Sequence, residues 1–307
     1  MEFILYKLHF KTGVHIGDGG LSGSEYTLPS DTFFSALCHE TVKQGLDIKE
    51  WVNAVRSKEL VFSDGLPFIE SRIYIPKPLK PVLAEKTSSP KFKKAFKKLK
   101  YIPVDKLDEY MAGDLKADDE EKTLSGLGVF ETHEKNSIKT YTETEPYQIG
   151  IYRFKRGNGI YFCVGYKKEK TIALFERLLQ GLSFTGVGGK ISSGYGKFET
   201  EKANVPFTME KRLKSKNAKT YMTLSFCLPK ENELESAMQN AYYLVGKRSG
   251  FVQSQNYAES FVKKKDMYLF RSGSCFSVQF EGDIYDVSSG GNHPVYRYGK
   301  PLFLEVD

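Results

Sequence analysis

The sequence predicts an α+β fold with two tandem ferredoxin-like domains, the second of them degenerate. Over the first 200 residues the patterns follow the order strand, helix, strand pair, long insertion, strand pair, helix and glycine-rich loop, which suits a βαββαβ unit that carries an insertion. A strand followed by a helix opens the chain at residues 2–44 and recurs at 221–245, which indicates a duplication. Because 307 residues exceed one typical domain, we expect domains at 1–205 and 206–307.

Hydrophobic periodicity marks the elements of the first domain. Apolar residues alternate where a strand is expected and recur every three or four residues where a helix is expected. Ser30 or Asp31 is placed to cap the first helix, and Gly45 to end it. Asn158-Gly159 lies between alternating segments and predicts a hairpin. The expected elements are a strand at 2–10, a helix at 30–44, two strands within 60–75 that turn at 63–65, a hairpin of 148–154 with 160–166, and a helix at 171–180.

The insertion, about residues 76–145, differs in composition from its surroundings. Four prolines fall within 76–90, six lysines within 91–100, and an acidic stretch follows at 105–121. Segments of this kind bury little apolar surface, so we expect the insertion to be partly mobile. Residues 91–100 also fit a basic amphipathic helix. Its lysine face is expected to be solvated, and a nucleic-acid contact is the alternative.

The second domain shows a weaker pattern of the same kind. Asn232 and Glu235 form a capping pattern for a helix, and Gly246 is placed to end that helix. The expected elements are a strand at 221–228, a helix at 232–245, and strands at 251–253, 267–270, 274–280 and 302–306.

The charge distribution indicates an anionic partner. The net charge is +7, and residues 146–200 carry +6 of it, against −2 for residues 1–145 and +3 for residues 206–307. An excess of this kind is typical of proteins that bind polyanions, so we expect the anion site near 146–200. Neither an apolar run of about 18 residues nor a signal-peptide pattern occurs. We therefore expect a cytoplasmic protein without a membrane contact.

Cysteine and histidine usage predicts no metal site and no cofactor. The four cysteines lie far apart without a Cys-x-x-Cys pair, and the five histidines lack metal-ligand spacing. Reduced, buried thiols are expected, as is usual for cysteines in a reducing cytoplasm.

The strongest chemical signal is a glycine-rich loop at residues 186–196. It combines five glycines with two serines and Lys190, and Lys197 follows it. Exposed backbone amides, hydroxyls and lysines together suit a phosphate backbone. The spacing does not match a Walker loop, and the loop follows a helix instead of a strand, so it does not match a dinucleotide fingerprint either. A polynucleotide backbone remains, and glycines that serve tight turns are the alternative.

This loop resembles the glycine-rich signature of the RAMP superfamily of CRISPR proteins. Within that superfamily the chain is similar to the fourth Csm subunits, of the Cas5 group, in type III-A effector complexes. Relatives often carry arginine where Ile191 stands, so we expect Lys190 and Lys197 to supply the charge. The three further motifs that carry the resemblance are Val14-His15-Ile16-Gly17, Leu28-Pro29-Ser30-Asp31-Thr32-Phe33-Phe34-Ser35-Ala36-Leu37 and Lys247-Arg248-Ser249-Gly250-Phe251-Val252.

The resemblance implies a non-catalytic, RRM-like subunit that binds RNA. It would hold the 5′ tag of the guide RNA (crRNA), dock on the large palm-domain subunit, adjoin a backbone RAMP subunit, and meet target RNA only indirectly. A thumb-like hairpin is expected within 72–160. The implied RNA-binding residues are His15, Gly17, Ser30, Asp31, Gly186, Gly188, Gly189, Lys190, Ser192, Ser193, Gly194, Tyr195, Gly196, Lys247, Arg248, Ser249 and Phe251.

Several of these residues have alternative interpretations. Tyr195 suits base stacking and equally a core position, and Asp31 suits an RNA contact and equally a helix cap. His15 beside a flexible loop is the candidate general acid/base of a RAMP-type endoribonuclease that processes precursor crRNA. In such nucleases the glycine-rich loop lies near the C-terminus, whereas here about 110 residues follow it. Asp18 raises a similar question of RNA cleavage. An RRM-like protein unrelated to CRISPR is the third possibility.

Overall fold

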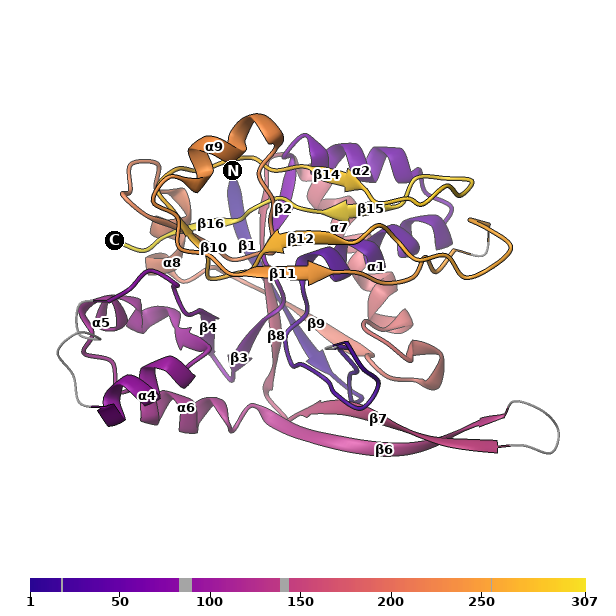
Figure 1. Cartoon of the computed structure of the whole chain (residues 1–307), viewed down its shortest axis with the longest axis horizontal. Helices are drawn as coiled ribbons and strands as arrows, with labels where there is room; N and C mark the ends of the chain where they lie inside the picture. Colours follow the sequence, from indigo (N-terminus) through magenta and orange to yellow (C-terminus); the bar gives the residue numbers. More distant parts are fainter. Residues whose placement is uncertain (18, 83–89, 139–143, 255) are drawn as a thin grey trace.

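A seven-stranded antiparallel sheet forms the framework of the first half of the chain (Figure 1). The structure is a computed structural model that describes residues 1–17, 19–82, 90–138, 144–254 and 256–307. Its elements up to residue 203 are β1 (Glu2–Phe10), α1 (Ser30–Lys43), α2 (Ile48–Arg56), β2 (Leu60–Phe62), β3 (Leu66–Ile69), β4 (Arg72–Pro76), α4 (Pro90–Lys98), β5 (Tyr101–Pro103), η1 (Val104–Lys106), α5 (Leu107–Ala112), α6 (Ala117–Leu124), β6 (Gly128–Ile138), β7 (Thr144–Phe154), β8 (Asn158–Tyr166), α7 (Glu169–Thr185), η2 (Ile191–Ser193) and β9 (Phe198–Ala203).

The centre of this sheet has the order β3-β8-β1-β9, with β2 also paired to β8. Alternate residues of each strand face opposite sides. Leu8 and Phe162 face the core formed with α1, α2 and α7. Leu5 and Tyr161 face a second core that includes residues of the second half and of the insertion. Both faces of the sheet are therefore covered, which explains why β8 is buried along eight of its nine residues.

The turn predicted at 63–65 is a bulge and not a hairpin turn. β2 and β3 both pair with β8, with Phe62 opposite Val164 and Leu66 opposite Tyr161. Three residues of this strand therefore face two residues of β8, which is the geometry of a β-bulge. The hairpin turn comes later, between β3 and β4, where Ile69 pairs with Arg72.

The predicted hairpin of 148–154 with 160–166 is wrong, although both strands exist. β7 pairs along its length with β6, whereas β8 pairs with β1, β2 and β3. The turn between β7 and β8 is closed by the Asn158 amide, which donates to the Lys155 carbonyl at 3.0 Å, and Asn158-Gly159 already belongs to β8. The Asn158 side chain donates to the Gly126 and Leu127 carbonyls where the chain enters β6. β6 and β7 form a long two-stranded ribbon, the hairpin arm (128–138 and 144–154), which projects from the body in Figure 1. A hairpin within 72–160 is thereby confirmed.

The insertion contributes to the core, contrary to expectation. Phe96, Leu99, Leu107 and Tyr110 are almost fully buried, and all four belong to the second core. The predicted lysine-rich helix exists as α4. Lys93, Lys94 and Lys97 are exposed, which agrees with a solvated face. The part of the insertion at 83–89 and 139–143 lies outside the described residues.

The second half has short strands and one helix between its first two strands. Its elements are α8 (Phe207–Lys214), β10 (Tyr221–Thr223), α9 (Glu231–Met238), β11 (Val245–Arg248), β12 (Met267–Phe270), β13 (Cys275–Phe276), β14 (Ile284–Asp286), β15 (Tyr296–Tyr298) and β16 (Phe303–Glu305). β10 lies between β13 and β16, and β11-β12 and β14-β15 are two-stranded ribbons. Of the predicted 251–253 strand, the structure shows an isolated bridge between Phe251 and Lys263.

The predicted helix at 232–245 ends early, and its predicted cap and stop are wrong. Lys230 is the N-cap, and its backbone amide donates to Glu233, so Asn232 and Glu235 do not form the cap. The helix ends at Met238 because the following Tyr- and Leu-rich segment, which has high strand propensity, pairs with the sheet. Tyr242 exchanges both backbone hydrogen bonds with Cys275, and Gly246 lies within β11.

Asp64, in the bulge between β2 and β3, joins the two halves at the start of α1. Its Oδ1 accepts from the Ser30 amide at 2.8 Å and from the Phe226 amide at 3.1 Å. The prediction that Ser30 or Asp31 caps α1 is therefore wrong, because the helix begins at Ser30 and Pro29 is the N-cap residue. The Asp64 carboxylate accepts the hydrogen bond of the Ser30 amide in place of a side-chain cap. Burial raises the pKa of the Asp64 carboxyl to about 6, against opposing hydrogen bonds that lower it.

We predict that the Asp64→Asn variant becomes more stable than wild type as pH rises. The folded pKa is about 6 and the ordinary value is 3.8, so in this window the folded protein holds a proton that the unfolded chain has released. Wild type therefore loses stability from pH 4 to 6, and the loss persists above pH 6. Asparagine keeps the accepting oxygen without the charge. Urea unfolding should give equal stabilities near pH 4 and an advantage of up to about 3 kcal/mol for the variant at pH 7, at 1.36 kcal/mol per pKa unit.

Asp64→Ala is the companion variant, because it removes the oxygen as well as the charge. It should be less stable than wild type at pH 4, where Asp64→Asn should match wild type. A pH-independent difference between wild type and Asp64→Asn would contradict the raised pKa.

Candidate nucleic-acid interface

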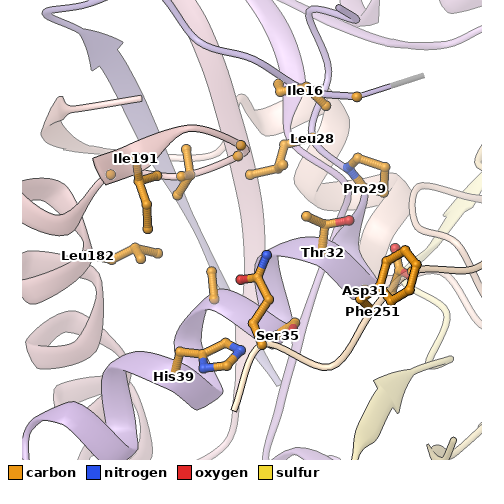
Figure 2. Close-up of a pocket in the computed structure, with 18 of the residues that line it drawn as sticks. Ile16, Leu28, Pro29, Asp31, Thr32, Ser35, His39, Leu182, Ile191 and Phe251 are labelled. Atoms are coloured by element: carbon orange, nitrogen blue, oxygen red, sulfur yellow. The ribbon is translucent and has the colours of Figure 1, made fainter. Parts of the chain in front are cut away.

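A cleft of about 530 Å³ lies where the two halves of the chain meet. The loop after β1, the first turns of α1 and the glycine-rich loop form one side, and residues 248–251, Lys264 and Arg297 of the second half form the other. Figure 2 shows Asp31, Thr32 and His39 of α1 facing the cleft, with Phe251 beside Asp31 and with Leu182 and Ile191 across from them.

The cleft brings together residues of all four sequence motifs, although not every predicted residue lines it. The predicted residues that line it are His15, Gly17, Asp31, Gly186, Gly188, Gly189, Arg248, Ser249 and Phe251. The predicted residues that lie outside its lining are Ser30, Lys190, Ser192, Ser193, Gly194, Tyr195, Gly196 and Lys247. Asp18 lies outside the described residues.

His15 is buried at the junction of three segments. Its Nδ1 donates to the Gly150 carbonyl of β7 at 2.7 Å, and its backbone carbonyl accepts from the Gly189 amide at 2.8 Å. Because Nδ1 carries the hydrogen in this bond, Nε2 is the accepting nitrogen of the neutral ring. His15 therefore fixes the loop after β1 between the hairpin arm and the glycine-rich loop.

The glycine-rich loop packs closely against the protein's own backbone. Gly196 has φ +77°, and a Cβ there would collide with the Val187 carbonyl oxygen. Gly188 has φ +87°, and a Cβ there would collide with the His15 carbonyl oxygen. At these two positions the tight-turn interpretation of the glycines is confirmed.

Lys190 and Tyr195 face the hairpin arm instead of the cleft. The Lys190 ammonium lies 4.7 Å from the centre of the Tyr147 ring and donates to its hydroxyl at 3.3 Å. The Tyr195 hydroxyl contacts His133 Nδ1 at 3.0 Å. His133 Nε2 in turn contacts Glu131 at 3.0 Å. These contacts connect the glycine-rich loop to the middle of the arm.

Asp31 forms a buried ion cluster with two arginines of the second half. Arg248 contacts both carboxylate oxygens, through Nη2 at 2.8 Å and Nε at 3.0 Å, and Arg297 Nη1 contacts Oδ2 at 2.8 Å. Both Asp31 and Arg297 are less than 10% exposed. Arg248 also donates to the Thr32 hydroxyl at 2.8 Å. Asp31 therefore joins α1 to β11 and β15, a role that neither sequence interpretation included.

Ser30 and Lys247 occupy opposite extremes of exposure. Ser30, the first residue of α1, is fully buried. Its position therefore does not support the predicted direct contact with RNA. Lys247 is exposed on β11 and pairs with Asp266 at 2.8 Å.

The cations that line the cleft come from outside the predicted 146–200 region. They are Lys43, Arg248, Lys264 and Arg297, and the imidazoles of His15 and His39 line the cleft as well. In the predicted region, Arg153 pairs with Glu131, Lys168 with Glu59 and Lys170 with Glu50. The cations of the cleft therefore come from other segments, although residues 182–191 of the predicted region line it, and the location of the anion site stays a prediction.

Among the cleft residues that the sequence analysis missed are His39, Lys43, Lys264 and Arg297. Burial, followed by repulsion from Lys264, lowers the pKa of His39. Burial, followed by repulsion from Arg297, lowers the pKa of Lys264. His39 follows a recognised helix motif by two residues, which is the single sequence signal that pointed to it. Lys264 and Arg297 are isolated basic residues in segments without a motif.

Neither a metal site nor a membrane span occurs in the described part of the chain. Among the described residues no group of three histidine, cysteine, aspartate or glutamate side chains is placed to hold a metal ion. No helix within the described ranges is long and apolar enough to cross a membrane.

Comparison with known proteins identifies relatives along the whole chain. Residues 7–199 match the RAMP superfamily, and residues 216–306 match the CRISPR Csm4 C-terminal domain. The chain is 36% identical to the CRISPR system Cms protein Csm4 of Mycobacterium tuberculosis, over 100% of this chain and 98% of the relative. It is 32% identical to the protein of the same name from Streptococcus thermophilus, over 98% and 99% respectively.

Two solved structures share the fold. The chain is similar to a chain of the Csm3–Csm4 subcomplex of the type III-A CRISPR-Cas interference complex, with a TM-score of 0.67, 18% identity and 99% coverage of both chains. It is also similar to a chain of the Csm1–Csm4 cassette in complex with AMPPNP, with a TM-score of 0.60, 16% identity, and coverage of 99% of this chain and 98% of that chain.

We predict that Asp31→Ala destabilises the protein by about 3–5 kcal/mol, the cost of leaving buried partner charges uncompensated. Asp266→Ala is the matched control, because Asp266 also contacts two cations, Lys247 and Lys263, but on the surface. Urea unfolding should show little change for the control. Equal losses in the two variants would show that the buried cluster has no special role.

A second prediction separates the glycines of the loop. Gly196→Ala should strongly destabilise the loop, since a Cβ collides with rigid backbone, whereas a Cβ at Gly194 meets nothing within 4 Å. Both positions have positive φ, +77° and +86°, so Gly194→Ala controls for conformational strain, which costs about 1 kcal/mol. Thermal unfolding should give the larger fall in Tm for Gly196→Ala. Similar falls in Tm for the two variants would show that the positive φ alone, and not the close backbone contact, requires glycine at position 196.

Proposed function

The chain belongs to the Csm4 family of the RAMP superfamily, and on this premise we propose that it binds the 5′ tag of the crRNA as a non-catalytic subunit of a type III-A complex. The observation that carries this proposal is the cleft between the two halves. It combines cations with few anions, and an aromatic ring that is 58% exposed, Phe251. Single-stranded RNA is held by such a combination, because phosphates contact the cations and unstacked bases contact the ring.

The position of the cleft supports a strand that runs between the two halves. Backbone amides and small residues of the glycine-rich loop lie on one side, and Arg248, Ser249 and Phe251 lie on the other. The hairpin arm passes beside the cleft, because β7 contacts His15 through Gly150. An arm anchored at that point is placed to contact the same strand beyond the cleft, as the thumb of the family is expected to do.

The proposal assigns no catalytic residue. His15 is held by a backbone carbonyl, and no hydrogen bond or ion pair joins it to a carboxylate or to a second histidine within the described ranges. General acid/base catalysis of RNA cleavage needs a positioned partner for the second proton transfer. We therefore assign His15 to shaping the cleft.

We also propose that the two halves are tandem ferredoxin-like units, the second one degenerate. In the first half the order β3-β8-β1-β9 with α1 and α7 as the crossover helices supports this. In the second half β10 lies between β16 and β13, and Cys275 of β13 bridges to Tyr242 near β11. The segment that leads into β11, then β13, β10 and β16, therefore follow the same spatial order as β3, β8, β1 and β9 of the first half. α9 takes the place of the first crossover helix, and the β14-β15 ribbon takes the place of the second.

The partners of the solved relatives support the assembly proposal. Those structures contain Csm4 with Csm3 and Csm4 with Csm1. We propose that this chain likewise contacts a neighbouring backbone RAMP subunit and the large subunit, and that it meets target RNA only through the complex.

The test is binding of the purified chain to fluorescent RNA that carries the repeat-derived 5′ tag, against RNA with a scrambled 5′ end. Phe251→Ala should weaken binding of the tag RNA by about 5- to 150-fold, the range for loss of 1–3 kcal/mol of stacking. Phe261→Ala is the control, because Phe261 is 89% exposed and lies outside the cleft.

The same incubations are analysed on denaturing gels. Intact RNA with tag-dependent binding is the expected result. Cleavage that disappears in His15→Ala would support the endoribonuclease alternative and overturn the non-catalytic assignment. Equal affinity of Phe251→Ala and wild type would place the RNA elsewhere on the protein.

A further inference from the structure

The wall of the cleft that belongs to the second half carries more positive than negative charge. Arg248, Arg297 and Lys264 approach one another there, and Asp31 is the carboxylate among them. Both oxygens of Asp31 already contact the two arginines. One carboxylate neutralises one cation, so the protein itself leaves part of this charge uncompensated.

Lys264 is the cation that is left without an anion. Its backbone is fixed, because its amide donates to the Gly250 carbonyl at 2.9 Å in the segment that carries Phe251. Its ammonium forms no hydrogen bond or ion pair with the described part of the chain, in contrast to Lys263 and Lys247, which both pair with Asp266. The titratable groups around it are Arg297, Asp31, Cys38, Arg248 and His39.

A half-buried ammonium beside two arginines is unfavourable unless a ligand supplies the opposite charge. Burial and repulsion by Arg297 lower the pKa of Lys264, which is the effect expected of a cation that lacks a partner. A protein retains such an arrangement at a binding site, where the charge is compensated when the ligand binds.

We propose that Lys264 binds a backbone phosphate of the RNA strand in the cleft, next to the nucleotide whose base contacts Phe251. This inference rests on the proposed function and adds a residue to it. A phosphodiester fits because it carries one negative charge and offers oxygen acceptors to the three donors of an ammonium. Asp31 keeps Arg248 and Arg297 in place, and Lys264 is left free for the ligand.

The proposal has opposite consequences for stability and for binding. Lys264→Met removes the uncompensated charge and keeps the apolar stem, so the free protein should become more stable, with Tm higher by about 2 °C. The same variant should lose one phosphate contact. Its plot of log binding constant against log salt should therefore be shallower than that of wild type by about 0.7, the contribution of one phosphate in a single strand.

Lys263→Met is the matched control, since it removes the same charge from the adjacent residue. Lys263 lies outside the cleft lining and pairs with Asp266 at 3.4 Å. The control should keep the wild-type salt slope and should not gain stability. Anisotropy titrations of tag RNA at several salt concentrations measure the slope, and thermal unfolding of the free chain measures Tm.

The outcomes separate the two levels of the proposal. If wild type does not bind tag RNA, the proposed function fails. If wild type binds and Lys264→Met keeps the full salt slope, the function stands and the assignment of Lys264 is wrong. A shallower slope together with a lower Tm would indicate that Lys264 supports the fold, which also overturns the inference. Stabilisation of wild type by inorganic phosphate as strongly as by RNA would indicate a free anion instead of a polynucleotide.

Discussion

The ion cluster of Asp31 with Arg248 and Arg297 is the interaction on which the arrangement of the two halves depends. It connects the first turn of α1 to β11 and β15, which are more than 200 residues away in the chain. Such a cluster contributes little net stability compared with apolar packing, but breaking it leaves charges buried. Its main effect is therefore geometric, since it fixes which surfaces of the two halves face each other. Asp64 supports the same junction, because it contacts both the start of α1 and the amide of Phe226.

The cleft is a consequence of that junction. Each half supplies surfaces that would be unremarkable alone, namely a helix start with a glycine-rich loop on one side and a short ribbon with isolated basic residues on the other. Together they enclose a volume in which cations outnumber carboxylates. Two carboxylates line the cleft: Asp31 contacts both arginines, and Glu40 pairs with Lys43. The remaining positive charge is therefore available to an anionic ligand, and an exposed aromatic ring lies in the same cleft.

The glycine-rich loop has a structural role that is separate from ligand contact. Its glycines let the loop approach the backbone of residues 13–15 and of Val187, while Lys190 and Tyr195 turn away towards the hairpin arm. The loop, the segment after β1 and the middle of the arm are thus joined through His15, Gly150 and Gly189. These contacts connect the cleft rigidly to the arm. They give His15, Lys190 and Tyr195, which the motifs alone assigned to RNA binding, a structural role.

The sequence by itself determined the local elements and the family. Alternation in 2–10 and helical spacing in 30–44 and 171–180 are local properties. The structure confirms the first two elements to within one residue, and the third as the longer helix Glu169–Thr185. The predicted site residues also include nine of the 27 residues that line the cleft. The tertiary structure alone decided which strands pair and which side chains contact one another. β7 pairs with β6 instead of β8, Tyr242 leaves the predicted helix for a strand pair, and Asp31 binds two arginines of the distant half. Lys264 became recognisable only when its surroundings were known, because charge compensation depends on neighbours in space, which a local sequence pattern does not specify.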